Sequence, residues 1–245
     1  MRKLADLLSV AALPLAAAVV AVTCLAGAPR PASAAGVAGA GALDLIAQLL
    51  MTSKGVAGAS SGQEAAIQRE ARLKQIERLK RNGKLRDAGR LMPMLKDPDG
   101  VVRQHAEQAI WSVWGRSGNA EIDRLFHAGV GQMGRREIEK AIDTFTRVVD
   151  NLPTFAEAWN KRATARFIAG DLAGAMDDCE HALSLVPDHF GSLAGYGHIY
   201  FRLDDLDMAI LYWQRALDVN PNLDSVARSI EAAEKMLIGR GRLRT

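Results

Sequence analysis

The sequence predicts an all-α protein built from repeated pairs of helices, and three observations point to that class. Pro153, Pro187 and Pro221 lie 34 residues apart twice over, a period typical of helical repeats. The chain is rich in alanine and only 5% aromatic, which favours helix over sheet. Hydrophobic residues make up 49% of its 245 residues, so it contains enough apolar side chains to form a core.

The first 34 residues have the three parts of a secretory signal peptide. Two basic residues precede an apolar run over 7–28, and small residues follow at Ala32 and Ala34. This order predicts cleavage after Ala34. The alternative is an uncleaved membrane anchor, since the 22 residues of 7–28 are just enough to span a bilayer.

Charge and cysteine content argue against a nucleic-acid-binding protein and against a protein stabilised by disulfides. The net charge is only +3, so the composition does not suggest a nucleic-acid-binding protein. The cysteines are Cys24 and Cys179, so removal of the leader leaves one thiol and no internal disulfide.

Residues 35–62 are rich in Gly, Ala and Ser, and predict a linker around one short helix at 43–51. A charged helix is expected next, over 63–81, and Asn82-Gly83 is expected to end it. Its narrow apolar stripe consists of Ile67, Leu73, Ile76 and Leu79.

Residues 69–90 carry nine Lys and Arg against three acids. One interpretation is a basic patch for an anionic membrane face or an acidic partner. The other is a solvated helix face with pairs such as Glu70–Lys74 and Glu77–Arg81. The narrow apolar stripe and the regular spacing of the acids favour the second interpretation.

The stretch over 91–114 resembles one HEAT-type helical hairpin, with Leu91 and Leu95 on its first helix and a turn at Asp97-Pro98. Because a single solenoid unit is rarely stable alone, we expect 63–116 to stack on the repeats as an N-terminal extension of the same core. Trp111 and Trp114, one helical turn apart, are the expected contacts at that seam.

Aligning the chain on the three prolines gives units at 122–155, 156–189 and 190–223. The middle unit resembles a tetratricopeptide (TPR) repeat along its whole length, through Trp159, Ala163, Gly170, Ala175, Ala182 and Pro187. The third unit follows the pattern through Leu193, Gly197, Tyr200, Ala209, Ala216 and Pro221, with Asp204 in place of the usual Gly. The first unit is more degenerate, with Arg136 and Val148 where Gly and Ala are usual.

This resemblance implies a right-handed α-solenoid in which each unit is two antiparallel helices. Positions are counted from the first residue of each 34-residue unit. Small residues at positions 8, 20 and 27 let the helices approach, and bulky residues at positions 4 and 24 fill the space between units. A further helix over 224–238 resembles the one that closes TPR arrays, and a basic tail follows at 239–245. Its apolar stripe is Val226, Ile230, Ala233 and Leu237.

Residues 129–134, GVGQMG, match the G-x-G-x-x-G pattern of dinucleotide-binding turns. That turn requires a buried hydrophobic strand immediately before it, whereas NAEIDRLFHA is charged and has helical spacing. We therefore place GVGQMG inside the first helix of the first unit, with Gly129 at its small position. Three glycines predict that this is the loosest of the six TPR helices.

The sequence contains no pattern typical of an enzyme. The five histidines are scattered without metal-ligand spacing, and no nucleophile elbow is present, so no metal, catalytic residue or cofactor is expected. The pairs Asp177-Asp178 and Asp204-Asp205 are expected at exposed positions, where acids do not acquire the split pKa values of catalytic pairs. Cys179 occupies packing position 24, so a buried thiol is expected there.

In TPR arrays the first helix of each unit lines the concave side, so the resemblance implies a groove that binds an extended or helical peptide. The implied contact residues are Phe126, Val130 and Met133 in the first unit, Asn160, Thr164 and Phe167 in the second, and His198, Phe201 and Arg202 in the third. Family members that hold a chaperone's C-terminal carboxylate need Lys and Asn where this chain has Phe126 and Val130, so that binding mode is not expected.

The sequence thus predicts a non-enzymatic protein-binding scaffold or assembly adaptor. It is similar to small exported TPR proteins of Gram-negative bacteria, which implies the periplasm. Two alternatives stay open: a membrane-tethered assembly factor anchored by residues 1–28, and an enzyme that uses a pocket not visible in the sequence.

Overall fold

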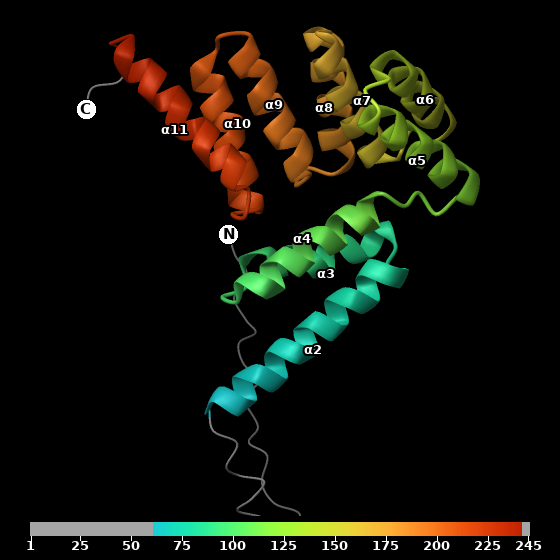
Figure 1. The fold of residues 1–245 in the computed structure, drawn as a ribbon, viewed down its shortest axis with the longest axis vertical. Helices are drawn as coiled ribbons and strands as arrows, with labels where there is room; N and C mark the ends of the chain where they lie inside the picture. Colours follow the sequence, from blue (N-terminus) through green and yellow to red (C-terminus); the bar gives the residue numbers. More distant parts are fainter. Residues whose placement is uncertain (1–60, 242–245) are drawn as a thin grey trace, which may run out of the picture. The chain divides into compact units, whose positions relative to one another are not determined.

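The computed structural model describes residues 61–241, and every regular element within that range is a helix (Figure 1). The α-helices are α2 (Ser61–Asn82), α3 (Ala88–Leu91), α4 (Gly100–Trp114), α5 (Ala120–Gly134), α6 (Ile138–Asn151), α7 (Ala156–Ala169), α8 (Leu172–Leu185), α9 (Phe190–Arg202), α10 (Leu206–Val219) and α11 (Asp224–Gly239). Two short 3-10 helices, η1 (Leu85–Asp87) and η2 (Met92–Lys96), flank α3. The predicted leader (1–34), the predicted linker up to residue 60 and the end of the basic tail (242–245) lie outside the described residues.

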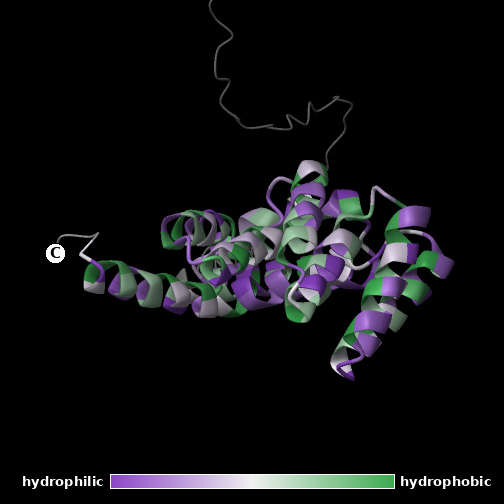
Figure 2. Cartoon of the chain, turned by 90° about the horizontal axis from the view of Figure 1, so that it is seen from above, coloured by the Kyte–Doolittle hydropathy of each residue, from purple (hydrophilic) through white to green (hydrophobic). Residues whose placement is uncertain are grey.

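Helices α5 to α10 form three antiparallel pairs, one in each 34-residue unit, and stand side by side in chain order (Figure 1). The first helices of successive units also touch, α5 with α7 and α7 with α9. Hydrophobic and hydrophilic residues share most of these helices, so each has an apolar side to bury (Figure 2). This arrangement is the predicted right-handed α-solenoid of TPR pairs.

The turn inside each pair places one residue in the left-handed backbone region. These residues are Arg136 with φ 62°, Gly170 with φ 91° and Asp204 with φ 64°. They occupy the same position in the three units, and glycine is the residue that adopts this conformation without a steric cost. The array therefore keeps the geometry of the turn even where the glycine of the repeat pattern is absent.

Within a helix pair, a very small residue on one helix makes room for a bulky residue on the other. A Cβ on Gly129 would lie 2.7 Å from the Phe145 ring, and a Cβ on Gly197 would overlap the Trp213 ring. The second unit has Ala163 at the small position, and there the facing residue is the small Cys179. The glycine of GVGQMG at position 129 thus lies within α5 and makes room for an aromatic ring.

Helix α11 closes the array by packing on α10. All four residues of its predicted stripe are buried in one cluster with Leu206, Ala209 and Trp213 of α10. At its end the Arg240 guanidinium forms an ion pair of 2.8 Å with Asp204 in the turn of the third unit. The cap therefore covers the last apolar face of the array, as the sequence predicts.

The segment before the array differs from the predicted hairpin. Residues 85–96, whose second half was expected to form the first hairpin helix, form the short elements η1, α3 and η2, and Pro93 lies in the first turn of η2. A proline has no backbone N–H to donate, so a long α-helix does not run through this position. Helix α4 packs mainly on α2, through Ile76 and Leu79 of the predicted stripe, while Ile67 is 65% exposed and takes no part.

The seam between this segment and the array lies at the connectors after the second and third units. Trp111 and Trp114 contact Phe190 at ring distances of 4.8 and 4.9 Å, and Trp114 stacks on His189 at 4.1 Å. Val186 and Leu223 of these connectors, with Val219 at the end of α10, pack against the same core cluster. The predicted seam residues are confirmed as contacts, but the segment packs across the ends of later repeats instead of continuing the stack ahead of α5.

Candidate functional site

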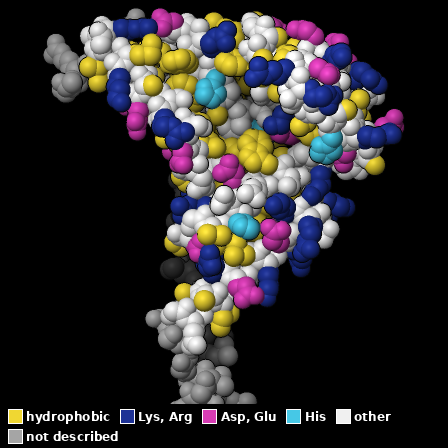
Figure 3. Space-filling view, viewed as in Figure 1, with side chains coloured by type: hydrophobic (Ala, Val, Ile, Leu, Met, Phe, Trp, Pro, Cys, Tyr) yellow, Lys and Arg dark blue, Asp and Glu magenta, His cyan; other side chains and the backbone are white. Residues whose placement is uncertain are grey.

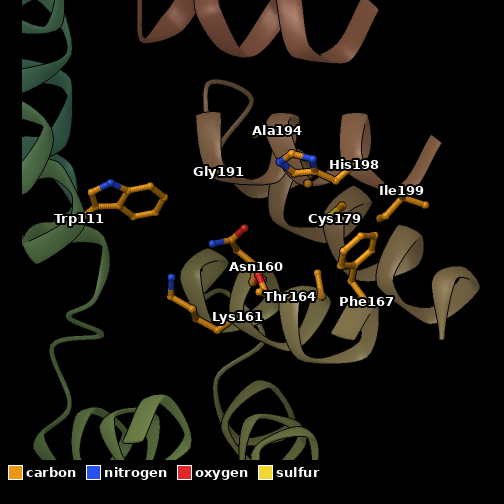
Figure 4. A pocket seen from close by; sticks show the side chains of 12 residues that line it. Trp111, Asn160, Lys161, Thr164, Phe167, Cys179, Gly191, Ala194, His198 and Ile199 are labelled. Atoms are coloured by element: carbon orange, nitrogen blue, oxygen red, sulfur yellow. The ribbon is translucent and has the colours of Figure 1, made fainter. Parts of the chain in front are cut away.

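The first helices of the second and third units, α7 and α9, enclose a pocket of about 250 Å³. Figure 4 shows the side chains of α7 and α9 facing each other across it, with Trp111 of α4 at one end. Its lining includes Asn160, Lys161, Thr164 and Phe167 of α7, and Gly191, Ala194, His198 and Ile199 of α9. Figure 3 shows the corresponding hollow on the surface, with hydrophobic side chains at its base.

Small residues on α9 create the space. Ala194 leaves room opposite Thr164, and a Cβ on Gly191 would lie 2.6 Å from the Trp111 ring. The pocket therefore depends both on the small side chains of the third repeat and on the position of α4 at the seam.

The structure brings four of the nine predicted contact residues together in this pocket, namely Asn160, Thr164, Phe167 and His198. Phe126 and Val130 line a second pocket of about 360 Å³, which shares Trp111 and Lys161 with the first. Met133, Phe201 and Arg202 line neither pocket. Met133 packs against the core of the first unit, while Phe201 lies 36% exposed beside Trp213.

Phe126 belongs to the core more than to a binding surface. Its side chain is 3% exposed, and its ring lies 5.0 Å from that of Phe155 and 5.8 Å from that of Phe145. It fills space between the first and second units, so only an edge of it reaches the second pocket.

A buried hydrogen-bond network fixes the polar end of the first pocket. The Glu157 carboxylate accepts from Asn160 at 3.0 Å, lies 3.0 Å from His189 Nε2, and pairs with Lys161 at 3.0 Å. The Ser192 backbone N–H donates to His189 Nδ1, so Nε2 carries the proton that is donated to Glu157. Burial alone would raise the pKa of Glu157, but the Lys161 charge and the His189 hydrogen bond outweigh it and hold that pKa below its ordinary value.

The apolar end is formed by Phe167 and His198. The Arg202 guanidinium lies 5.2 Å from the centre of the Phe167 ring, a cation–π distance. Burial lowers the pKa of His198, so its imidazole is neutral at neutral pH and has one donor and one acceptor nitrogen. This end therefore offers apolar surface with one neutral polar group.

Sequence reasoning did not assign Trp111 and Lys161 to the site. The Lys161 ammonium lies 5.1 Å from the centre of the Trp111 ring, so the two residues together form one end of the pocket. Lys161 is adjacent to Asn160 but outside the family's groove positions. Trp111 lies outside the repeats, so no repeat position could have indicated it.

The described residues show neither a metal-ligand cluster nor an activated thiol. Within 61–241 no group of three or more His, Cys, Asp or Glu is placed to hold a metal ion. Cys179 is 1% exposed, and burial, with a smaller effect of Asp178, raises the pKa of its thiol to about 12. It is thus a protonated packing residue at the base of the pocket. No helix in the described range is long and apolar enough to span a bilayer.

Comparison with known proteins finds similarity to tetratricopeptide repeats. Residues 191–223 match the family model for the tetratricopeptide repeat. A TPR repeat-containing protein of Rhizobium etli is 29% identical over 126 residues, which cover 51% of this chain and 62% of that protein. Sperm-associated antigen 1 of Mus musculus is 31% identical over 101 residues, which cover 41% of this chain and 11% of that protein. The chain therefore spans less than two thirds of the length of these relatives.

Two solved structures resemble the chain over about half its length. The Sgt2 TPR domain from Aspergillus fumigatus is 24% identical with a TM-score of 0.49, covering 51% of this chain and 84% of that domain. The first TPR domain of Spaghetti, solved with an HSP90 peptide, is 24% identical with a TM-score of 0.46, covering 48% and 93%. The third unit therefore matches the tetratricopeptide repeat model, and the other two units share its helix-pair arrangement and its 34-residue period.

Proposed function

We propose that the chain is a non-enzymatic scaffold that binds a segment of another polypeptide along α5, α7 and α9. The pocket between α7 and α9 carries this proposal. Its walls are apolar at Phe167 and Ile199, and polar groups stand at Asn160 and His198. A hollow of this composition suits a hydrophobic side chain of a peptide whose backbone is oriented by a few hydrogen bonds.

Large exposed apolar side chains also occur outside the pocket on α5, α7 and α9. Val130 of α5 is 38% exposed, Ile168 of α7 is 54% exposed and Phe201 of α9 is 36% exposed. Exposed apolar side chains on a shared set of helices are typical of protein-interaction sites. It supports a partner that extends across more than one repeat.

The proposal is tested by blocking the pocket without disturbing the helices. Thr164 is exposed, lines the pocket, and donates its hydroxyl to the Asn160 carbonyl of its own helix at 2.9 Å. Ser184 on α8 is a matched control, because it is also exposed and donates to a carbonyl of its own helix, that of His181, at 2.8 Å. We expect Thr164→Arg to abolish capture of the partner and Ser184→Arg to preserve it, with unchanged helicity in both.

Captured proteins are identified by mass spectrometry, and the captured segment is then titrated as a synthetic peptide. Trp111 lines the pocket, so a change in the tryptophan fluorescence of the chain reports occupancy. We expect at least about tenfold weaker binding for Thr164→Arg, equivalent to about 1.4 kcal/mol. Equal binding by wild type and Thr164→Arg would contradict the groove assignment.

We also propose that the scaffold acts after export, as a mature chain that begins at Ala35. The support is the pattern of residues 1–34, which combines a basic start, an apolar run and small residues before the cleavage point. N-terminal sequencing of the protein from the periplasmic fraction of a Gram-negative host tests this. A membrane-bound chain that keeps residues 1–28 would contradict it.

A further inference from the structure

The basic residues at 69–90 fall into two groups, those that form an ion pair with a carboxylate and those that do not. Four of them face a carboxylate: Arg69 with Asp99, Arg72 with Asp97, Lys74 with Glu70 and Arg90 with Asp87. Asp97 and Asp99 come from the connector between η2 and α4, which folds back along α2. The first half of α2 is therefore neutralised by acids from its own helix and from this connector.

The other five, Arg78, Lys80, Arg81, Lys84 and Arg86, have no carboxylate within ion-pair distance among residues 61–241. The expected Glu77–Arg81 pair does not form, because Glu77 contacts His105 at 3.2 Å instead. Lys80 donates to the neutral Gln108 at 3.2 Å. These cations follow the second half of α2 into η1, and Figure 3 shows Lys and Arg side chains gathered at that end of α2.

Four cations surround a recess of about 430 Å³ at this place: Arg81, Lys84, Arg86 and Arg116. Arg116 comes from the connector between α4 and α5 and donates to the backbone carbonyls of Lys80 and Gly83, which fixes its position. The one acid in the lining is Asp123, and its Oδ1 already accepts from the Ser117 backbone and hydroxyl at 2.6 Å each. The recess therefore holds an excess of positive charge, which an anionic group would neutralise.

We infer that this basic recess (Arg81, Lys84, Arg86 and Arg116) is a second interaction site, which binds an acidic segment of a polypeptide with two or more neighbouring carboxylates. Guanidinium groups bind carboxylates through paired hydrogen bonds, and three of the four cations are arginines. The four cations surround one hollow, although they come from two separate parts of the chain. Neighbouring carboxylates of a single peptide segment can therefore reach several of them at once.

An anionic membrane fits the recess less well. A helix binds a bilayer more strongly when an apolar face lies beside its cations, but Ile76 and Leu79 of α2 are buried against the rest of the extension. Leu85, at 40% exposed, is the one large apolar side chain in the recess lining. A single leucine at a concave surface gives a membrane little to bind.

The test measures binding of a fluorescein-labelled hexaglutamate peptide by fluorescence anisotropy at low salt, with hexaglutamine as the neutral control. The test variant combines Arg81→Gln, Lys84→Gln and Arg86→Gln, all exposed positions, and leaves Arg116 intact because it holds the end of α2. The charge-matched control combines Lys74→Gln, Arg90→Gln and Lys140→Gln, each of which has an acidic partner in the structure. We expect about tenfold weaker binding for the test variant and less than about twofold for the control.

Equal weakening in the two variants would mean that only net charge attracts the peptide, and would overturn the assignment. Binding to phosphatidylserine vesicles that is lost in the test variant, with no binding of hexaglutamate by the wild type, would assign the surface to a membrane and also overturn it. If circular dichroism shows that the triple variant is unfolded, the single reversal Arg86→Glu carries the same expectation.

Discussion

The repeat array and the segment before it are both helical, yet their cores are assembled in different ways. In the array each contact joins fixed positions of neighbouring helices, such as Gly129 with Phe145 and Gly197 with Trp213. In the segment before it, Trp114 packs on His189 and Phe190, which lie far along the chain. The first kind of core follows from the period of the sequence, whereas the second depends on which surface of the array is left uncovered.

The largest effect is expected from breaking the contact that joins the two regions. Trp114, the last residue of α4, is 2% exposed and packs on the connector before α9, so Trp114→Ala removes a large buried ring at the seam. We expect a loss of about 3–5 kcal/mol in the free energy of unfolding, measured by chemical denaturation. If residues 61–119 are a separate folding unit, the loss is below about 1 kcal/mol and the seam is not a shared core.

Trp159→Ala is the matched control for that experiment. Trp159 lies half-buried on α7 inside the array, away from the seam, and its indole donates to the Pro153 carbonyl at 2.7 Å. A smaller loss is expected for Trp159→Ala, since less of its ring is buried. An equal loss in the two variants would mean that the seam contributes no more than an ordinary contact within a repeat.

A smaller loss is expected from disturbing the contact between small and bulky positions inside a repeat. A Cβ on Gly197 would overlap the Trp213 ring, which is 1% exposed and has little freedom to move. We expect Gly197→Ala to lower the free energy of unfolding by about 1–3 kcal/mol, as overpacked cores do. Gly134→Ala is the control, because its Cβ would meet nothing within 4 Å. A stabilised Gly197→Ala variant would show that helix propensity outweighs packing at this position.

The same contrast explains which features the sequence could predict. The helix pairs and the pocket residues Asn160, Thr164, Phe167 and His198 follow the positions of the 34-residue repeat, so one period locates them. The capping stripe follows from the spacing of apolar residues along one helix. Trp111 has no such position, and its place in the pocket depends on how α4 crosses the connectors.

The charge pattern of α2 was unpredictable for a similar reason. Spacing along one helix predicts the Glu70–Lys74 pair, which the structure confirms at 2.7 Å. It gives no information on Asp97 and Asp99, which reach α2 only after the chain folds back, or on His105, which takes Glu77 away from Arg81. Spacing shows which local pairs can form, whereas the tertiary structure decides which of them do and which pairs form between elements.

The smallest effect is a gain, and it compares the turns of the three repeats. Arg136 has φ 62° where the second unit has Gly170, and an L-residue in this region costs about 1–2 kcal/mol. Glycine relieves that cost but loses more chain entropy on folding, so Arg136→Gly should raise the free energy of unfolding by about 0.5–1 kcal/mol.

Asp204→Gly makes the same change in the third unit but also removes the ion pair with Arg240, at 2.8 Å, so its gain should be smaller. Thermal and chemical unfolding of the two variants beside the wild type measure both values. If Arg136→Gly lowers stability, the arginine side chain makes a contact worth more than the backbone strain, and the first unit departs from the repeat pattern for a structural reason.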